Sequence, residues 1–447
     1  MMKKILTRSA LMLSMSLLTF CASPEDTEVR DTVSELENLE VKLDNVYKTS
    51  STPIQGQYIV VLNDGVLPNP KDLSFTNKGS QKQAYFQQID AAKASMVATA
   101  KGPEPFAFDV KKIKSVYTFA LDGFVANLTD DEVEMLRKDP RVKSIDQDRL
   151  VTLKKPRGGG GGGSATQQIP YGITRVGGAG DGTGKTAWVL DTGIDLDHED
   201  LNVDVARSVS FTGDNNPNDV DGHGTHVAGT IAAIDNNIGV VGVAAGASVV
   251  ACKVLGDDGT GAFSWTVQAL DYVRAVGSNG DVANMSLGPQ SRFIDSATDN
   301  ATAALGASGI KVAIAAGNSY DDCSFYSPAR TNQANVFTIS GIGEGDVVYW
   351  FSNYGSPVDY AAPGVNVLST TPGNTYASFS GTSMASPHAA GVLLLGSYTT
   401  DGVRLGGYFQ VRGNYILLNN YSATDDFNRS VYREDPDGVD DPIIVRN

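Results

Sequence analysis

The sequence predicts a small α+β unit followed by a larger α/β unit, whose parallel sheet is flanked by helices. Two patterns carry this prediction. Short apolar runs alternate with helical stretches between residues 187 and 340, which is typical of strands buried on both faces. A separate strand and helix alternation spans residues 57–148, and a glycine run divides it from the first pattern.

Length and composition limit the classes of protein that fit. The chain has 447 residues, of which 41% are hydrophobic, so it can bury a core in two or three domains. Its net charge of -16 argues against nucleic acid or an anionic membrane as partner, because both attract basic surfaces. The acidic balance fits an exported protein that can bind cations.

Residues 1–23 have the pattern of an export signal. Basic residues precede an apolar run at 10–20 that is too short to span a bilayer. Cys21 follows a stretch that resembles a bacterial lipoprotein signal, although Phe20 replaces the usual small residue. We therefore expect an extracellular or surface-bound protein with a possible lipid anchor at Cys21, and ordinary signal-peptidase cleavage is the alternative. Residues 24–55 are acidic and aperiodic, which indicates a tether.

Residues 56–153 follow the order β-α-β-β-α-β, which is the ferredoxin-like plan. A capping box from Thr129 to Glu132 opens the second helix. Asp122-Gly123 predicts a tight hairpin between the second and third strands. The strands are expected at 58–62, 116–121, 124–128 and 142–145, and the first helix at 81–99.

Residues 154–164 combine a basic cluster with six glycines, so they are expected to form a flexible, exposed linker. Such a segment is a favoured place for proteolytic release. We expect the mature protein to begin between Ser164 and Gln168.

The larger unit is expected at residues 165–396. Its catalytic groups should gather on loops and helix ends at one edge of the sheet. Gly182–Thr186 looks like a phosphate-binding loop, but Ala179 occupies its first glycine position and a strand follows where a helix is required. This argues against nucleotide binding. The strands are expected at 187–190, 248–255, 282–287, 311–316 and 335–340.

Three separated motifs carry the chemistry. An apolar strand ends at Asp191, a histidine-rich segment holds His223, and Ser383 lies where a helix begins. A helix N-terminus favours developing negative charge, and a serine nucleophile needs a base whose tautomer is fixed. Ser383 alone could simply cap its helix. The acid, the histidine and the serine in this order instead predict an orienting acid, a base and a nucleophile.

These motifs resemble those of subtilisin-like serine peptidases, the subtilases, most closely the proteinase K-like branch, over roughly residues 57–396. The resemblance implies a triad of Asp191, His223 and Ser383, with Asn318 as the oxyanion donor. It also implies that residues 56–153 are an inhibitory propeptide whose tail lies in the active site.

The expected function is therefore that of a secreted or surface-tethered serine endopeptidase. It would act on polypeptides through an acyl-enzyme, as a monomer, and would be made as a self-processing precursor. The alternatives are a catalytically inactive relative that binds peptides, and a hydrolase of non-peptide esters or amides.

The same resemblance implies a substrate-binding segment at Ser286, Leu287 and Gly288, to which a peptide would add as a β-strand. The glycine that usually follows is Pro289, which lacks an N–H group. The small residues Ala315, Ala316 and Gly317 would line the pocket for the side chain before the cut and leave room for a large apolar group.

Calcium is expected as a structural cofactor. Asp359 resembles a calcium aspartate of the proteinase K-like branch, with the carbonyl oxygens of Ala334 and Val336 as further ligands, and calcium prefers such oxygens. Ala334 stands where a proline is usual.

Other candidate groups have weaker patterns. His226 is expected to be a packed residue, because a zinc pair with His223 lacks the i, i+4 spacing and the glutamate of a zinc peptidase. Pairing of Cys252 with Cys323 is left open. Residues 397–447 form a C-terminal extension of unknown role.

Overall fold

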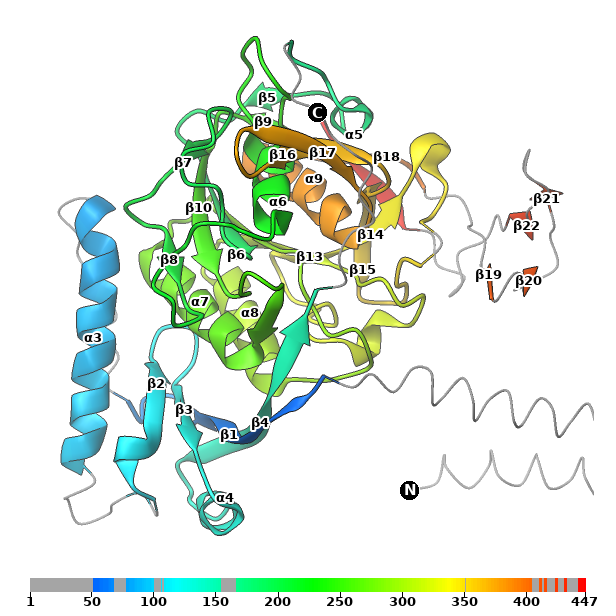
Figure 1. Cartoon of the computed structure of the whole chain (residues 1–447). Coiled ribbons are helices and arrows are strands. Elements are labelled where there is room, and N and C mark those ends of the chain that lie inside the picture. Colours follow the sequence, from blue (N-terminus) through cyan, green and yellow to red (C-terminus); the bar gives the residue numbers. More distant parts are fainter. Residues whose placement is uncertain are drawn as a thin grey trace, which may run out of the picture. The chain divides into compact units, whose positions relative to one another are not determined.

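The computed structural model describes residues 51–67, 78–99, 106, 108–153, 166–349, 351–403 and 441–447, and four two-residue strands between 410 and 431 (Figure 1). The expected signal segment, nearly all of the tether and the linker at 154–165 lie outside these residues. The short strands are β19 Gln410–Val411, β20 Asn414–Tyr415, β21 Ala423–Thr424 and β22 Ser430–Val431.

The N-terminal unit has the expected order of strands and helices. Its four long strands form an antiparallel sheet in the order β4-β1-β3-β2, and the capping box at Thr129 is present. The elements are β1 Pro53–Leu62, α3 Lys78–Thr99, β2 Ile113–Tyr117, β3 Gly123–Asn127, α4 Asp130–Leu136 and β4 Val142–Thr152, with a 3₁₀ turn at Val110–Lys112.

The expected hairpin joins β2 and β3, but its turn is longer than the predicted Asp122-Gly123 pair. Strand β2 already ends at Tyr117, and β3 begins at Gly123. The backbone N–H groups of residues 118–120 are not available to a β-ladder, because all three donate to the carboxylate of Asp271 in the larger unit.

The larger unit is built on a long sheet in the order β18-β23-β15-β14-β13-β12-β6-β10-β7, which is parallel from β23 to β7. The five strands expected from sequence are β6 Thr186–Asp191, β10 Ser248–Lys253, β12 Val282–Met285, β13 Lys311–Ala315 and β14 Val336–Ile342. The other members are β7 Asn202–Val203, β15 Val358–Pro363, β18 Tyr398–Val403, β23 Pro442–Arg446 and β8 Val209–Ser210, which pairs with β10 outside this order.

Helices cover both faces of this sheet (Figure 1). Along β6, Val189 joins the apolar cluster of α6 and α9, whereas its neighbours Trp188 and Leu190 join the cluster of α7 and α8. This alternation follows the period of two in a strand and explains why β6 reads as a continuous apolar run. The helices are α6 His223–Ala232, α7 Phe263–Val276, α8 Ser296–Ala307 and α9 Thr382–Leu395.

Shorter elements complete the unit. They are α5 Tyr171–Arg175, β5 Gly180–Asp181, β9 Ala244–Ala245, β11 Thr260–Ala262, β16 Val367–Thr371, β17 Thr375–Phe379 and 3₁₀ turns at Cys323–Phe325 and Glu344–Asp346. Cys252 and Cys323 are both buried, and they do not form a disulfide with each other. Among the described helices, none is both long and apolar enough to cross a membrane.

The end of the C-terminal extension belongs to the core of the larger unit. Strand β23 pairs with β15 through Ile443 and Ala361, and the side chains of Ile443 and Ile444 are fully buried. The buried carboxylate of Asp441 accepts a hydrogen bond from Ser340 Oγ at 2.8 Å. This segment therefore covers what would otherwise be an exposed edge of β15.

Candidate active site

Asp191 and His223 form a buried, hydrogen-bonded pair. Asp191 is the last residue of β6 and His223 the first residue of α6, and their exposed fractions are 0% and 1%. Asp191 Oδ1 lies 2.7 Å from His223 Nδ1 and also accepts the N–H of Thr192. This contact favours the tautomer with a proton on Nδ1, which leaves Nε2 free to accept a proton. Burial alone would lower the pKa of His223, but the carboxylate of Asp191 outweighs it and the pKa is raised.

A second buried carboxylate, which sequence reasoning missed, links the elements that carry this pair. Asp219 accepts hydrogen bonds from Thr192 Oγ1 at 2.9 Å and from the N–H groups of Gly222 and Thr225, at the start of α6. Thr192 Oγ1 in turn accepts the N–H of Gly224. A Cβ on Gly224 would lie 2.1 Å from the carbonyl oxygen of Gly193, so only glycine permits this close approach. The network fixes His223 relative to the end of β6.

Ser383 is the second residue of α9, so its N–H is one of the free donors of a helix N-terminus. Its Oγ donates to the carbonyl oxygen of Ser286 at 3.2 Å, and Ser286 Oγ donates to the Ser383 carbonyl at 2.8 Å. In the part of the chain that the structure describes, no hydrogen bond joins Ser383 to His223. Helices α6 and α9, which carry these two residues, pack against each other.

The side chain of Asn318 is oriented by the start of α9. Its Oδ1 accepts the N–H of Thr382 at 2.9 Å and the Thr382 hydroxyl at 3.1 Å, which turns Nδ2 away from Thr382. A Cβ built on Gly381 would lie 3.6 Å from Asn318 Oδ1 and 3.7 Å from both Asn318 Nδ2 and the Ser383 nitrogen. The side-chain amide of Asn318 and the N–H of Ser383 are therefore close to the same glycine at the start of α9.

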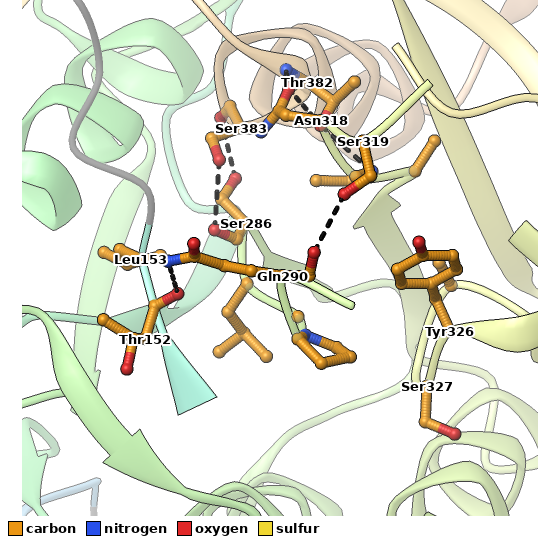
Figure 2. A pocket seen from close by; sticks show the side chains of 17 residues that line it. Thr152, Leu153, Ser286, Gln290, Asn318, Ser319, Tyr326, Ser327, Thr382 and Ser383 are labelled. Atoms are coloured by element: carbon orange, nitrogen blue, oxygen red, sulfur yellow. Dashed lines mark hydrogen bonds between the residues drawn. The ribbon is translucent and has the colours of Figure 1, made fainter. Parts of the chain in front are cut away.

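A cavity opens beside Ser383 (Figure 2). All six residues that the sequence indicated for substrate binding line it, together with Asn318 and Ser383, while their role remains a prediction. No acidic side chain is among the lining residues that the structure describes. The lining is formed by Thr152, Leu153, Ser286, Leu287, Gly288, Pro289, Gln290, Ala315, Ala316, Gly317, Asn318, Ser319, Tyr326, Ser327, Ala329, Thr382 and Ser383.

The end of β4 from the N-terminal unit forms part of the wall of this cavity. Residues 150–152 pair in antiparallel register with β11, and the N–H of Leu153 donates to the carbonyl of Gly259 at 2.9 Å. Thr152 and Leu153 both line the cavity (Figure 2). Sequence reasoning missed β11 as a binding element, because three residues are too few to show a periodic pattern.

The N-terminal unit is also held by carboxylates at helix α7. Asp271, fully buried on α7, accepts the N–H groups of Thr118, Phe119 and Ala120 at 3.1, 2.7 and 2.7 Å, and the hydroxyl of Tyr85 at 3.1 Å. Burial raises the pKa of Asp271 to about 7. Asp148 on β4 accepts the N–H of Ser264, in the first turn of the same helix.

The remaining histidines near α6 and α9 have structural surroundings. His226 Nε2 lies 2.9 Å from the carbonyl oxygen of Val367, its ring stacks on Phe379, and burial lowers its pKa to about 3. His388 is buried with Nδ1 2.8 Å from the carbonyl of Met384, and burial lowers its pKa to about 4. Both stay neutral, as packed core residues do.

The expected calcium ligands lie on, or just before, two paired strands. Among the described residues, no three His, Cys, Asp or Glu side chains form a metal-binding group. Asp359 on β15 accepts the N–H of Thr338 through Oδ2 at 2.8 Å, and burial raises its pKa to about 6. Val336 begins the neighbouring strand β14 and Ala334 precedes it. Carboxylate and carbonyl oxygens are the kind of ligand that calcium prefers.

Comparison with known proteins finds a matching family for each of the two units. Residues 182–397 match the model of the Subtilase family, and residues 57–154 match Peptidase inhibitor I9. M-protease of Shouchella clausii is 42% identical over 278 residues, which are 60% of this chain and 67% of that protein. Subtilisin E of Bacillus subtilis is 34% identical over 329 residues, 71% of this chain and 81% of that protein. The crystal structure of a cold adapted subtilisin-like serine proteinase is 39% identical, with a TM-score of 0.42, and covers 48% of this chain and 76% of that one.

Proposed function

The chain belongs to the subtilase family and is a serine endopeptidase made as a precursor, and from this we propose that Ser383, His223 and Asp191 are its catalytic triad. The observation that carries the proposal is the buried 2.7 Å contact between His223 Nδ1 and Asp191 Oδ1. It supplies a base with a fixed tautomer, on a helix that packs against the helix of Ser383.

The chemistry follows from these positions. The Ser383 hydroxyl turns from the Ser286 carbonyl towards His223, and its oxygen attacks the peptide carbonyl carbon while Nε2 takes the proton. Asp191 stabilises the imidazolium that results. Asn318 Nδ2 and the Ser383 N–H donate to the negative oxygen of the tetrahedral intermediate. His223 then protonates the leaving amine, and water releases the acyl group by the same steps in reverse.

We propose that residues 56–153 act as the propeptide domain and inhibit residues 165–396, the peptidase domain. The end of β4 supports this, since it pairs with β11 as an added strand and its residues Thr152 and Leu153 line the cavity beside Ser383. Release would follow a cut in the linker, with the mature enzyme beginning between Ser164 and Gln168. We also propose that the protein is exported, either with a lipid anchor at Cys21 or after ordinary signal-peptidase cleavage.

The test is a Ser383→Ala substitution in the full chain. It should abolish peptide hydrolysis and leave the precursor uncut, because self-processing needs the same hydroxyl. Ser380→Ala is the matched control, since it removes a nearby hydroxyl that accepts the N–H of Asn366. Normal maturation of the Ser383→Ala chain in a protease-free preparation would reject the proposal. Casein hydrolysis that a serine-directed reagent blocks would exclude the inactive, peptide-binding alternative.

We further propose that Asp359 holds a calcium ion with the carbonyl oxygens of Ala334 and Val336. The ion would compensate the buried carboxylate, whose pKa is raised to about 6. Chelation should then lower the midpoint of thermal inactivation, and Asp359→Asn should remove this sensitivity. An unchanged midpoint in the chelated wild-type enzyme would contradict a calcium site.

A further inference from the structure

We infer that the side-chain amide of Gln290 binds the main chain of extended peptide substrates, and this inference rests on the proposed function. The groove next to Ser383 has two walls. One is β11, with which the end of β4 pairs, and the other is the segment from Ser286 to Gln290 that follows β12 and lines the cavity.

The end of β4 forms main-chain hydrogen bonds with one wall and a side-chain hydrogen bond with the other. Residues 150–152 pair with β11, and the N–H of Leu153 donates to Gly259. Successive residues of a strand direct their main-chain groups to opposite sides, so the carbonyl of Thr152 faces the second wall. There it accepts a hydrogen bond from Gln290 Nε2 at 3.0 Å. Within the described chain, no main-chain hydrogen bond joins residues 286–290 to residues 150–153.

The neighbours of Gln290 explain why a side chain takes this role. Pro289 is buried and has no N–H to offer a substrate. The main chain of Gln290 is itself anchored, because its carbonyl accepts the hydroxyl of Ser319 at 3.1 Å. Figure 2 shows Gln290 between Thr152 and Ser319, with its side chain directed at Thr152. The anchored backbone thus presents a neutral amide donor to the groove.

This geometry defines the substrate that benefits. An uncharged amide that bonds a main-chain carbonyl selects for chain length and not for side-chain identity. Peptides that extend far enough before the cut to place a carbonyl at the position of Thr152 gain the contact. Shorter peptides leave the amide of Gln290 in water.

The experiment uses enzyme that is expressed as the full chain and then allowed to mature. The concentration of active enzyme is determined by titration with a serine-directed reagent. The probes are peptide p-nitroanilides with one to five residues before the cleaved bond, and kcat/KM is measured at each length. For the wild-type enzyme, kcat/KM should rise at the length that first places a substrate carbonyl at the position of the Thr152 carbonyl. Gln290→Ala should reduce that gain by about 2- to 10-fold, the range for one neutral hydrogen bond. Gln290→Glu keeps the shape of the side chain but has no N–H donor, so this variant should also lose the rise in kcat/KM.

Two further variants complete the design. Gln290→Lys keeps a donor and should retain part of the gain. Gln333→Ala removes another exposed glutamine, remote from the cavity lining, and should keep all of it. The inference is overturned if Gln290→Ala keeps the full gain, or if it lowers kcat/KM equally at every length, since that indicates a purely structural role. A wild-type enzyme that cleaves none of these substrates would instead overturn the proposed peptidase function.

Discussion

Removing the carboxylate of Asp271 should weaken inhibition by the propeptide without changing peptide hydrolysis. Asp271 accepts three backbone N–H groups from residues 118–120 and the hydroxyl of Tyr85, and it is not among the residues that line the cavity. In Asp271→Ala these donors lose their acceptor. Each buried donor left unsatisfied costs about 1–3 kcal/mol, and water entering the space recovers part of this. A net loss of about 3–6 kcal/mol corresponds to an inhibition constant raised by about 100- to 10,000-fold.

The assay is inhibition of the mature enzyme by a recombinant propeptide of residues 51–153, with a peptide p-nitroanilide as substrate. Asp271→Asn keeps a carbonyl acceptor, so it should cost only about 1–2 kcal/mol. Asp197→Asn, at an exposed position, serves as the control. An Asp271→Ala enzyme that binds the propeptide within about threefold of wild type would refute the reasoning, because threefold is about the effect of one neutral hydrogen bond, whereas this substitution removes four.

The pH dependence of the propeptide's inhibition constant tests the role of Asp271 independently. Burial raises the pKa of Asp271 to about 7 in the complex. We expect water to reach this side chain once the propeptide has left, and a hydrated Asp titrates near 3.9. On this expectation the complex takes up a proton as it forms. The resulting contribution to binding is complete below about pH 4 and is lost as the pH rises through about 7. Inhibition should weaken across this interval, and Asp271→Asn should flatten the dependence.

Further predictions concern the catalytic groups and the core. Asn318→Ala should lower kcat by about 100- to 1,000-fold with little change in KM, a range borrowed from the equivalent asparagine of subtilisin. The kcat/KM profile should rise with pH through a His223 pKa above its ordinary value, because the neutral imidazole is the base, and Asp191→Asn should shift that midpoint downward. A midpoint unmoved by Asp191→Asn would contradict the assigned pair. In an inactivated background, Ile444→Ala should destabilise the fold by about 2–5 kcal/mol, measured as a lower unfolding midpoint, whereas Val205→Ala, at a position 51% exposed, should have almost no effect.

The sequence was sufficient for those features that depend on local pattern. Apolar runs located the central strands of the sheet, because strands buried on both faces are apolar along their whole length. The capping box at Thr129 was readable because its two partners lie three residues apart. The order of Asp191, His223 and Ser383 within their motifs indicated a peptidase before any distance was known.

Only the tertiary structure decided the features that join distant segments. Asp271 is one acidic residue in a helical stretch, and nothing near it in the sequence shows that it binds a loop some 150 residues earlier. Gln290 became a candidate for substrate binding only when its amide was seen to contact Thr152. Strand β23 lies in the core because β15 needs a neighbour, not because its own five residues demand a strand. Local periodicity records which face of an element is buried, whereas the partner that buries it is fixed by packing across the whole chain.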